Sequence, residues 1–297
     1  MSQPHMFGEA DLTKALSDSG AKLSRKVSAY LIGGCAMTFM GRKVVTKDVD
    51  VVFGSSDEAK EFTNALGQLG FASVKSLTGP YATMGTFAIV EDSRGMRFEI
   101  FDRHVCRALE LSTGMKSRAR PYRTFSNLQV HLMAPEDVFL FKGITEREAD
   151  LDDMRILAEV GLNWKTIETE CLSQNRSGRW AYLLGTKLME LRRKFDIASP
   201  IIKTLMDHAN MDLLVYAFGN VIGDKEIPFK EIARVINEKY GYKDSWTRKQ
   251  LALLAAKDFV RKRRQGREDI YSMTASGLSR PAAQHLRHHI LNKSRHG

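Results

Sequence analysis

Two spacings of hydrophobic residues follow one another along residues 1–162. Apolar residues three and four positions apart predict helices, and alternating apolar and polar residues predict half-buried strands. Helices are expected over residues 9–25, 35–40, 55–69, 135–142 and 146–160, and strands over residues 27–32, 48–53, 71–74, 86–91, 96–101 and 127–133. Helices and strands mixed in this way predict an α+β domain with a mixed sheet.

The pattern changes in the second half of the chain. Residues 163–205 are predicted to be helical, with a break at Ser199-Pro200. Helices are then expected over residues 227–240 and 246–261, followed by a basic turn over residues 262–268 and a short strand over residues 269–273. The predicted organisation is a mixed-sheet domain (1–162), a helical connecting region (163–211), a second domain (212–280) and a basic, His-rich tail (281–297).

The charge of the chain points to a polyanionic partner. Its 297 residues carry a formal net charge of +10, and nine Lys and Arg residues lie within residues 243–267. Such a balance most simply favours nucleic acid. Cys35, Cys106 and Cys171 are too few and too far apart for a disulfide framework or a zinc motif. No apolar run is long enough to span a membrane, and the N-terminus lacks signal-peptide features, so we expect a cytoplasmic protein.

A glycine pair ends one predicted strand, and a carboxylate pair lies on the next. Gly33-Gly34 ends the first strand, and Asp48 and Asp50 come after thirteen intervening residues. Residues two apart on a strand face the same side, so the two carboxylates project together, and a divalent cation would relieve their repulsion. Glycines that open a helix let backbone N–H groups approach a phosphate closely. Either pair alone would be an ordinary turn or a solvated strand edge; together they predict a metal and phosphate site.

These residues resemble a known signature. Gly33-Gly34, Thr46 and Asp48-Val49-Asp50 are similar to the signature of the nucleotidyltransferase superfamily that includes DNA polymerase beta. The minimal nucleotidyltransferases and the AbiEii-type toxins of toxin–antitoxin systems are similar too, over about residues 27–160. The resemblance implies Mg²⁺ or Mn²⁺ held by Asp48 and Asp50. It also implies a nucleoside triphosphate as substrate, bound with the help of Gly33, Gly34 and Thr46.

In that superfamily a third carboxylate on a nearby strand completes the metal site. The matching strand contains Glu99 between the apolar residues Phe98 and Ile100, and Asp102 follows near its end. Alternation along the strand favours Glu99, which would then face the same side as the other carboxylates. Asp102 is the alternative third carboxylate. If Glu99 has no such role, it is an ordinary surface residue of a half-exposed strand.

A further match lies in Pro135-Glu136-Asp137, Lys142 and the acidic run of residues 148–153. The resemblance implies that Lys142 binds the triphosphate and that the acidic run orients it. Without that resemblance, such a Lys is usually a surface residue and such a run a solvated helix face. In the implied reaction a nucleoside monophosphate passes to an acceptor and pyrophosphate leaves, with Glu99 near the attacking hydroxyl as proton acceptor.

The second half resembles a winged helix-turn-helix over residues 227–274. In such modules the second helix enters the major groove and the wing contacts the backbone. The resemblance implies nucleic-acid-binding residues on both elements: Arg248, Lys249, Lys257, Arg263, Arg264 and Arg267. A winged helix used only for protein contacts or dimerisation is the alternative.

Three functions are compatible with these residues. The first is a metal-dependent nucleotidyltransferase whose acceptor is nucleic acid or a protein bound near it; the AbiEii resemblance implies tRNA or a partner protein. A protein partner or a homodimer is compatible with the chain. The second is a DNA-binding regulator with an inactive nucleotidyltransferase-like domain. The third is a small-molecule modifier like the aminoglycoside nucleotidyltransferases, which the positive charge disfavours because aminoglycosides are cations. His285, His288 and His289 are expected in a solvated tail rather than a metal site, since no carboxylate or Cys accompanies them.

Overall fold

The computed structural model of the chain describes residues 6–74, 85–105, 109–145, 147, 149–174 and 179–278. The chain divides into two compact units, of which the first comprises Met1–Glu170 and Glu190–Ala198 and the second Cys171–Met189 and Ser199–Gly297. Helices and strands occur in both, so the protein is α+β, as the sequence predicted. Cys106, Glu148 and the tail with its three predicted solvated histidines lie outside the described residues.

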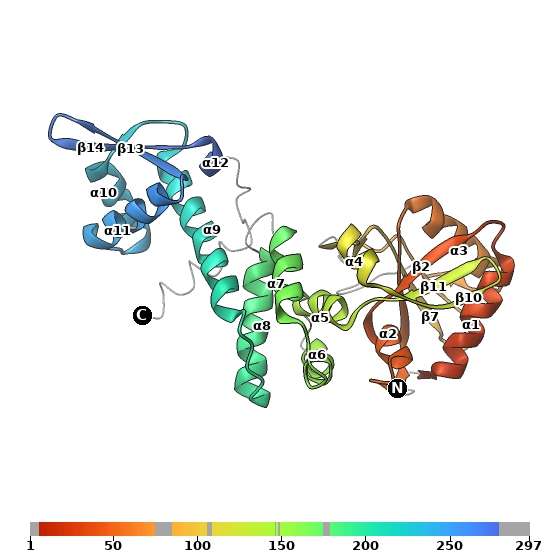
Figure 1. Cartoon of the computed structure of the whole chain (residues 1–297). Coiled ribbons are helices and arrows are strands. Elements are labelled where there is room, and N and C mark those ends of the chain that lie inside the picture. Colours follow the sequence, from red (N-terminus) through yellow and green to blue (C-terminus); the bar gives the residue numbers. More distant parts are fainter. Residues whose placement is uncertain are drawn as a thin grey trace. The chain divides into compact units, whose positions relative to one another are not determined.

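A mixed sheet forms the centre of the first unit (Figure 1). Within the described residues its order is β10-β11-β2-β4-β7-β6-β5. The bounds are β2 (Val27–Leu31), β4 (Asp48–Phe53), β5 (Ala72–Ser73), β6 (Ala88–Glu91), β7 (Arg97–Asp102), β10 (Arg120–Phe125) and β11 (Leu128–Leu132). The pairs β4–β7 and β11–β2 are parallel and the other neighbours antiparallel.

One face of this sheet packs against two amphipathic helices, α1 (Glu9–Lys22) and α3 (Ser56–Gln68). Phe62 of α3 contacts Phe53 of β4 and Phe98 of β7, with ring centroids 5.1 and 5.7 Å apart. Ser55 caps α3, because its hydroxyl oxygen accepts a hydrogen bond from the Glu58 N–H. Alternation leaves Asp48, Asp50 and Glu99 on the opposite face of the sheet, where a site can form.

Short helices border that second face. The helix α2 (Gly33–Phe39) follows β2 directly, and α5 (Pro135–Gly143) starts with Pro135 in its first turn, as predicted. The helix α6 (Asp150–Ala158) begins later than the predicted start at residue 146. Ala149 stands in a turn just before it.

Several short elements escaped the sequence analysis. They are β1 (Phe7–Gly8), β3 (Val45–Thr46), β8 (His104–Val105), β9 (Leu109–Glu110), α4 (Thr113–Arg118) and the longer β10. Two-residue strands carry no periodicity that a sequence could reveal, and β10 is mostly exposed, with a register shift between Pro121 and Arg123. The helices α7 (Trp164–Ser173) and α8 (Arg179–Phe195) follow, and the division between the two units passes through both.

The second unit is built from α9 (Ile202–Ile222), α10 (Phe229–Tyr240), α11 (Asp244–Ala256) and a small sheet of order β12-β14-β13. Its strands are β12 (Ile227–Pro228), β13 (Val260–Gln265) and β14 (Glu268–Met273), and α12 (Ala275–Leu278) follows them. Phe218, Ile232 and Leu251 lie at the centre of its hydrophobic core. The predicted boundary between residues 211 and 212 falls inside α9, which is helical throughout.

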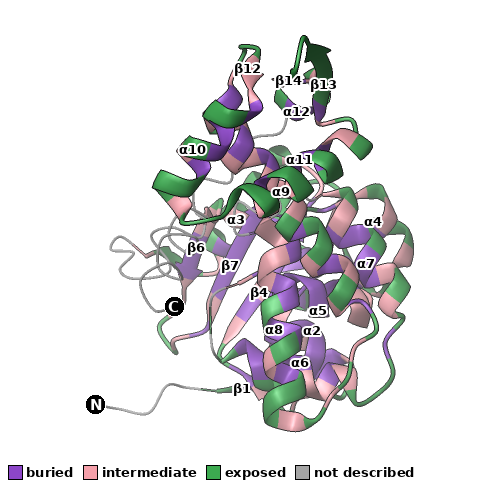
Figure 2. Cartoon of the chain, turned by 90° about the vertical axis from the view of Figure 1, so that its left-hand side faces the viewer, coloured by how far each residue is buried: buried purple, intermediate pink, exposed green. Residues whose placement is uncertain are grey.

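The basic segment of the second unit differs from the prediction. The helix expected over residues 246–261 already ends at Ala256, and most of the expected basic turn is the strand β13. Val260 is buried and pairs with Met273, and Gly266, with φ of 62°, closes a hairpin with β14. Consecutive basic residues hid this strand, because each of them is exposed and none alternates with an apolar residue (Figure 2).

Across the described parts of the chain, none of the helices combines the length and apolar character that crossing a lipid bilayer demands.

Candidate functional site

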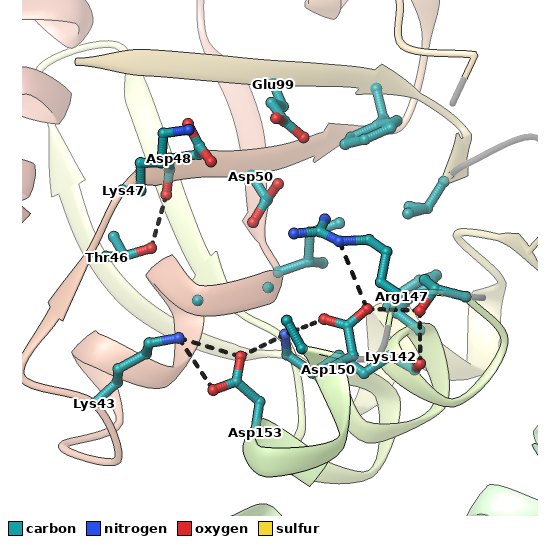
Figure 3. Close-up of a pocket in the computed structure, with 18 of the residues that line it drawn as sticks. Lys43, Thr46, Lys47, Asp48, Asp50, Glu99, Lys142, Arg147, Asp150 and Asp153 are labelled. Atoms are coloured by element: carbon teal, nitrogen blue, oxygen red, sulfur yellow. Dashed lines mark hydrogen bonds and ion pairs between the residues drawn. The ribbon is translucent and has the colours of Figure 1, made fainter. Parts of the chain in front are cut away.

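Three carboxylates lie together on the two parallel central strands. Asp50 of β4 is directly opposite Glu99 of β7, and Asp48 is two residues before Asp50 on the same face. Figure 3 shows the three side chains on one side of the sheet. Asp102 is on the other face, where it accepts a hydrogen bond of 2.5 Å from the Ser56 hydroxyl. The structure therefore places Glu99, and not Asp102, with the aspartates.

The glycine turn sits directly against these carboxylates. The Ile32 N–H donates to the Asp50 carbonyl at 3.1 Å, so the chain enters the turn beside β4. Gly33 has a φ of +60°, and a Cβ atom there would lie 2.0 Å from Asp50 Oδ2. A Cβ atom on Gly34 would lie 2.6 Å from Thr46 Oγ1. Both positions exclude a side chain, because each would collide with a residue of the candidate site.

All seven residues predicted for the catalytic and nucleotide site line one pocket of about 290 Å³. They are Gly33, Gly34, Thr46, Asp48, Asp50, Glu99 and Lys142. The volume is at the lower end of the range for small-molecule sites. Thr46 is 6% exposed, and its hydroxyl donates to the Asp48 carbonyl at 3.1 Å, so it also supports the backbone of β4.

Burial and mutual repulsion make these carboxylates hard to ionise. Burial, together with the neighbouring Asp48, raises the pKa of Asp50 to about 6. Burial followed by the charges of Asp50 and Asp48 raises the pKa of Glu99 to about 9, and burial also raises the pKa of Asp48. Acids with raised pKa values hold their protons, and these protons neutralise the cluster. A bound cation would neutralise the carboxylates in the same way and release the protons.

The residues present fit a divalent cation. Within the described part of the chain, Asp48 Oδ1 and Glu99 Oε2 are buried without a hydrogen-bond partner, which is costly unless something else satisfies them. Oxygen atoms of carboxylates are the ligands that Mg²⁺ prefers. Asp50 and Glu99 share a hydrogen bond. Among the described residues, no group of three or more His, Cys, Asp or Glu side chains is arranged so that it could hold a metal ion as it stands, so the three carboxylates would have to draw together around a bound cation.

Lys142 belongs to a buried ion-pair network, the Lys–Asp cluster, formed by Lys43, Lys142, Asp150 and Asp153. Lys142 Nζ lies 3.1 Å from Asp150 Oδ1 and 2.7 Å from Asp153 Oδ2, and Lys43 Nζ lies 3.0 Å from Asp153 Oδ1. Burial disfavours the charged amine of Lys142 and lowers its pKa. Asp150 and Asp153 together act more strongly, so the pKa of Lys142 is raised overall. The predicted acidic run thus holds Lys142, whereas its predicted contact with a triphosphate stays a prediction.

Sequence reasoning missed three cations that line the pocket: Lys43, Lys47 and Arg147. Arg147 Nε lies 4.0 Å from Asp150 Oδ2, and Figure 3 shows its side chain extending toward Asp50. Arg147 stands three residues before Asp150, so a search for cations flanking the acidic run would have found it. Lys43 and Lys47 stand on either side of β3, which had no recognisable pattern.

The basic residues predicted to bind nucleic acid are all exposed, on α11, the residue after it and the β13–β14 hairpin. They are Arg248, Lys249, Lys257, Arg263, Arg264 and Arg267. Arg248 is 3.4 Å from Asp269 and lies over the Phe229 ring at 3.8 Å. Arg263 is 2.5 Å from Glu226. Surface ion pairs such as these are weak, so they leave the basic residues available to phosphates.

No protein-family model matches this chain, and neither does any curated protein at the significance required.

Proposed function

We propose that the protein is a metal-dependent nucleotidyltransferase. The observation that supports this most is the convergence of Asp48, Asp50 and Glu99, from two parallel strands, on the Gly33-Gly34 turn inside one pocket. Acids packed this closely are unfavourable unless a cation joins them. Glycines at which a Cβ atom would collide with Asp50 or Thr46 keep the backbone within reach of a ligand. The proposal includes a nucleotidyltransferase-like fold for the first unit.

Asp48, Asp50 and Glu99 are the residues that would hold Mg²⁺ or Mn²⁺. A bound divalent cation neutralises phosphate oxygens and stabilises the charge that develops during in-line displacement. The chain itself would supply the turn at Gly33 and Gly34, the hydroxyl of Thr46 beside it, and a rim of cations that attracts the triphosphate.

The proposed reaction joins an acceptor hydroxyl to the α-phosphorus of a nucleoside triphosphate. The new bond forms between the acceptor oxygen and the α-phosphorus, while the bond from that phosphorus to the β-phosphate oxygen breaks and pyrophosphate leaves. The hydroxyl proton passes to an ionised carboxylate, for which Glu99 is placed, and then to solvent. Glu99 would act in its ionised form, which a bound cation would favour by lowering the raised pKa of this carboxyl group.

We propose that the second unit is a winged helix-turn-helix that brings the acceptor, most simply nucleic acid. Two features support this. The exposed basic strand β13 forms a hairpin with β14, and Arg248 and Lys249 are exposed on α11. Positive charge on a projecting hairpin and an adjacent helix favours phosphate contacts whose strength depends on salt.

A DNA-binding regulator with an inactive first unit is the second candidate. One observation favours it: the predicted triphosphate ligand Lys142 is enclosed by two carboxylates, at 3.1 and 2.7 Å. A regulator would bind duplex DNA without turning over a nucleotide.

Labelling separates the two. The protein is incubated with each α-labelled nucleoside triphosphate, Mg²⁺ or Mn²⁺, and total cellular RNA. Label that enters RNA or protein and is lost in Asp48→Asn supports the transferase. Duplex binding with no label transferred under any of these conditions rejects it and leaves the regulator.

A further inference from the structure

The pocket contains two kinds of cation, and they differ in burial and in what surrounds them. In the Lys–Asp cluster two lysines face two aspartates at hydrogen-bond distance. Its four charges cancel, and Lys142 is only 7% exposed. A phosphate that sought Lys142 would have to displace Asp150 or Asp153 and leave a buried carboxylate without its partner, which is strongly unfavourable.

Arg147 is arranged differently. Its side chain is 50% exposed, and its Nε is 4.0 Å from Asp150 Oδ2. It extends toward Asp50 (Figure 3). The positive charge of Arg147 opposes the rise in the pKa of Asp48, Asp50 and Glu99, although Lys142 opposes that of Asp50 more strongly. Arg147 is therefore within electrostatic reach of all three carboxylates while half of its side chain stays exposed.

We propose that Arg147 makes the direct contact with the triphosphate at this site and that Lys142 makes none. The proposal rests on the proposed function, since it names the ligand of that same pocket. A guanidinium offers paired N–H donors that match two phosphate oxygens, and it keeps its charge at any pH at which proteins fold. Lys142 instead holds α5 to α6 through Asp150 and Asp153.

The test uses inorganic tripolyphosphate with Mg²⁺, a probe without a base, and measures its dissociation constant by calorimetry on the full chain. Arg147→Gln is expected to weaken binding about tenfold or more, and Arg147→Lys to restore part of that affinity. Lys142→Met combined with Asp150→Asn removes one charge of each sign and leaves Lys43 paired with Asp153, so the cluster stays neutral. This double variant is expected to bind within about threefold of the wild type, since the remaining charges are still balanced.

Arg155→Gln is the matched control, because Arg155 is on α6 but pairs with Glu159, away from the pocket. Thermal unfolding checks that each variant is folded. If Arg147→Gln binds like the wild type while the double variant binds tenfold more weakly, Lys142 is the phosphate ligand and the inference is overturned. The proposed function survives that outcome, because the wild type still binds tripolyphosphate. A wild type that fails to bind the probe overturns both.

Discussion

The two units of this protein place their charged residues in opposite environments. In the first unit, most acids and lysines of the pocket are buried or half-buried, and several pKa values are displaced from their ordinary range. In the second unit, the arginines and lysines of α11 and β13 are exposed. Buried charge is expensive and persists where it stabilises a charged ligand or transition state, whereas exposed charge costs little and acts at long range. The contrast agrees with the proposal of chemistry in the first unit and attraction of a polyanion by the second.

Removing one acid of the pocket should have the largest effect on nucleotidyl transfer. Asp50→Asn deletes the carboxylate that touches both the glycine turn and Glu99, so nucleotidyl transfer should fall by roughly a thousandfold. Transfer of labelled nucleotide, measured at saturating Mg²⁺, checks this. Asp102→Asn is the control, because Asp102 faces the other side of the sheet and should leave transfer unchanged. Equal decreases in both variants would break the distinction between the two faces.

Gly33→Ala should come next. The new Cβ atom would lie 2.0 Å from Asp50 Oδ2, at a residue whose φ is +60°, so the turn and the carboxylate must move apart. Nucleotidyl transfer should therefore fall roughly a hundredfold. Gly41→Ala imposes similar backbone strain, at φ of +67°, but meets nothing within 4 Å. Each should lower the free energy of unfolding by about 1 kcal/mol. Comparing transfer rates at equal stability isolates the contact with Asp50, and similar rates in the two variants would count against a role for the turn.

Removing exposed charge should have a smaller and different effect. Arg264→Ser with Arg267→Ser should weaken nucleic-acid binding by roughly tenfold at low salt. The slope of log affinity against log salt should fall by about one for each phosphate that the variant no longer neutralises. Fluorescence anisotropy with a labelled duplex over a salt series measures both. Lys203→Ser, at another exposed position of the second unit, should change neither. An unchanged salt slope in the double variant would place the nucleic acid elsewhere.

The smallest expected effect is on stability. Because the folded pKa of Asp50 is raised to about 6, its carboxyl group favours folding below its unfolded value of 3.8, and that contribution is lost as pH rises through 6. Asp50→Asn should therefore become more stable than the wild type by about 1–2 kcal/mol between pH 5 and 8, with EDTA present. Urea unfolding at several pH values measures the difference. A difference that does not vary with pH would mean that Asp50 is not buried among like charges.

The lowered pKa values of Asp150 and Asp153 act in the opposite direction. Burial opposes the shift, but Lys142 together with Thr145 and Arg147 at Asp150, and with Lys43 at Asp153, outweighs it. Both acids therefore stabilise the fold at pH values above their unfolded pKa and lose that contribution as pH falls. The pH dependence of Asp50→Asn should consequently be read above pH 5, where these two acids stay ionised.

Most elements that carry the candidate site could be predicted from local pattern. Val27, Ala29 and Leu31 alternate with less buried residues in β2, and Asp48 and Asp50 do the same against Val49 and Val51 in β4. The strand β13 could not be predicted, because its residues are basic in succession and only pairing with β14 makes it a strand. The two-residue strands β1 and β3 likewise exist only through pairing with each other.

The sequence by itself determined which residues could form a site: acids two apart on one strand, a glycine pair, and a glutamate flanked by apolar residues. That information is local, since side-chain direction alternates along any strand. Only the tertiary structure decided that Glu99 stands opposite Asp50, that Gly33 touches Asp50, and that Lys142 is enclosed while Arg147 faces the pocket. These relations join strands and helices distant in the chain, so they depend on register and packing rather than on any local pattern.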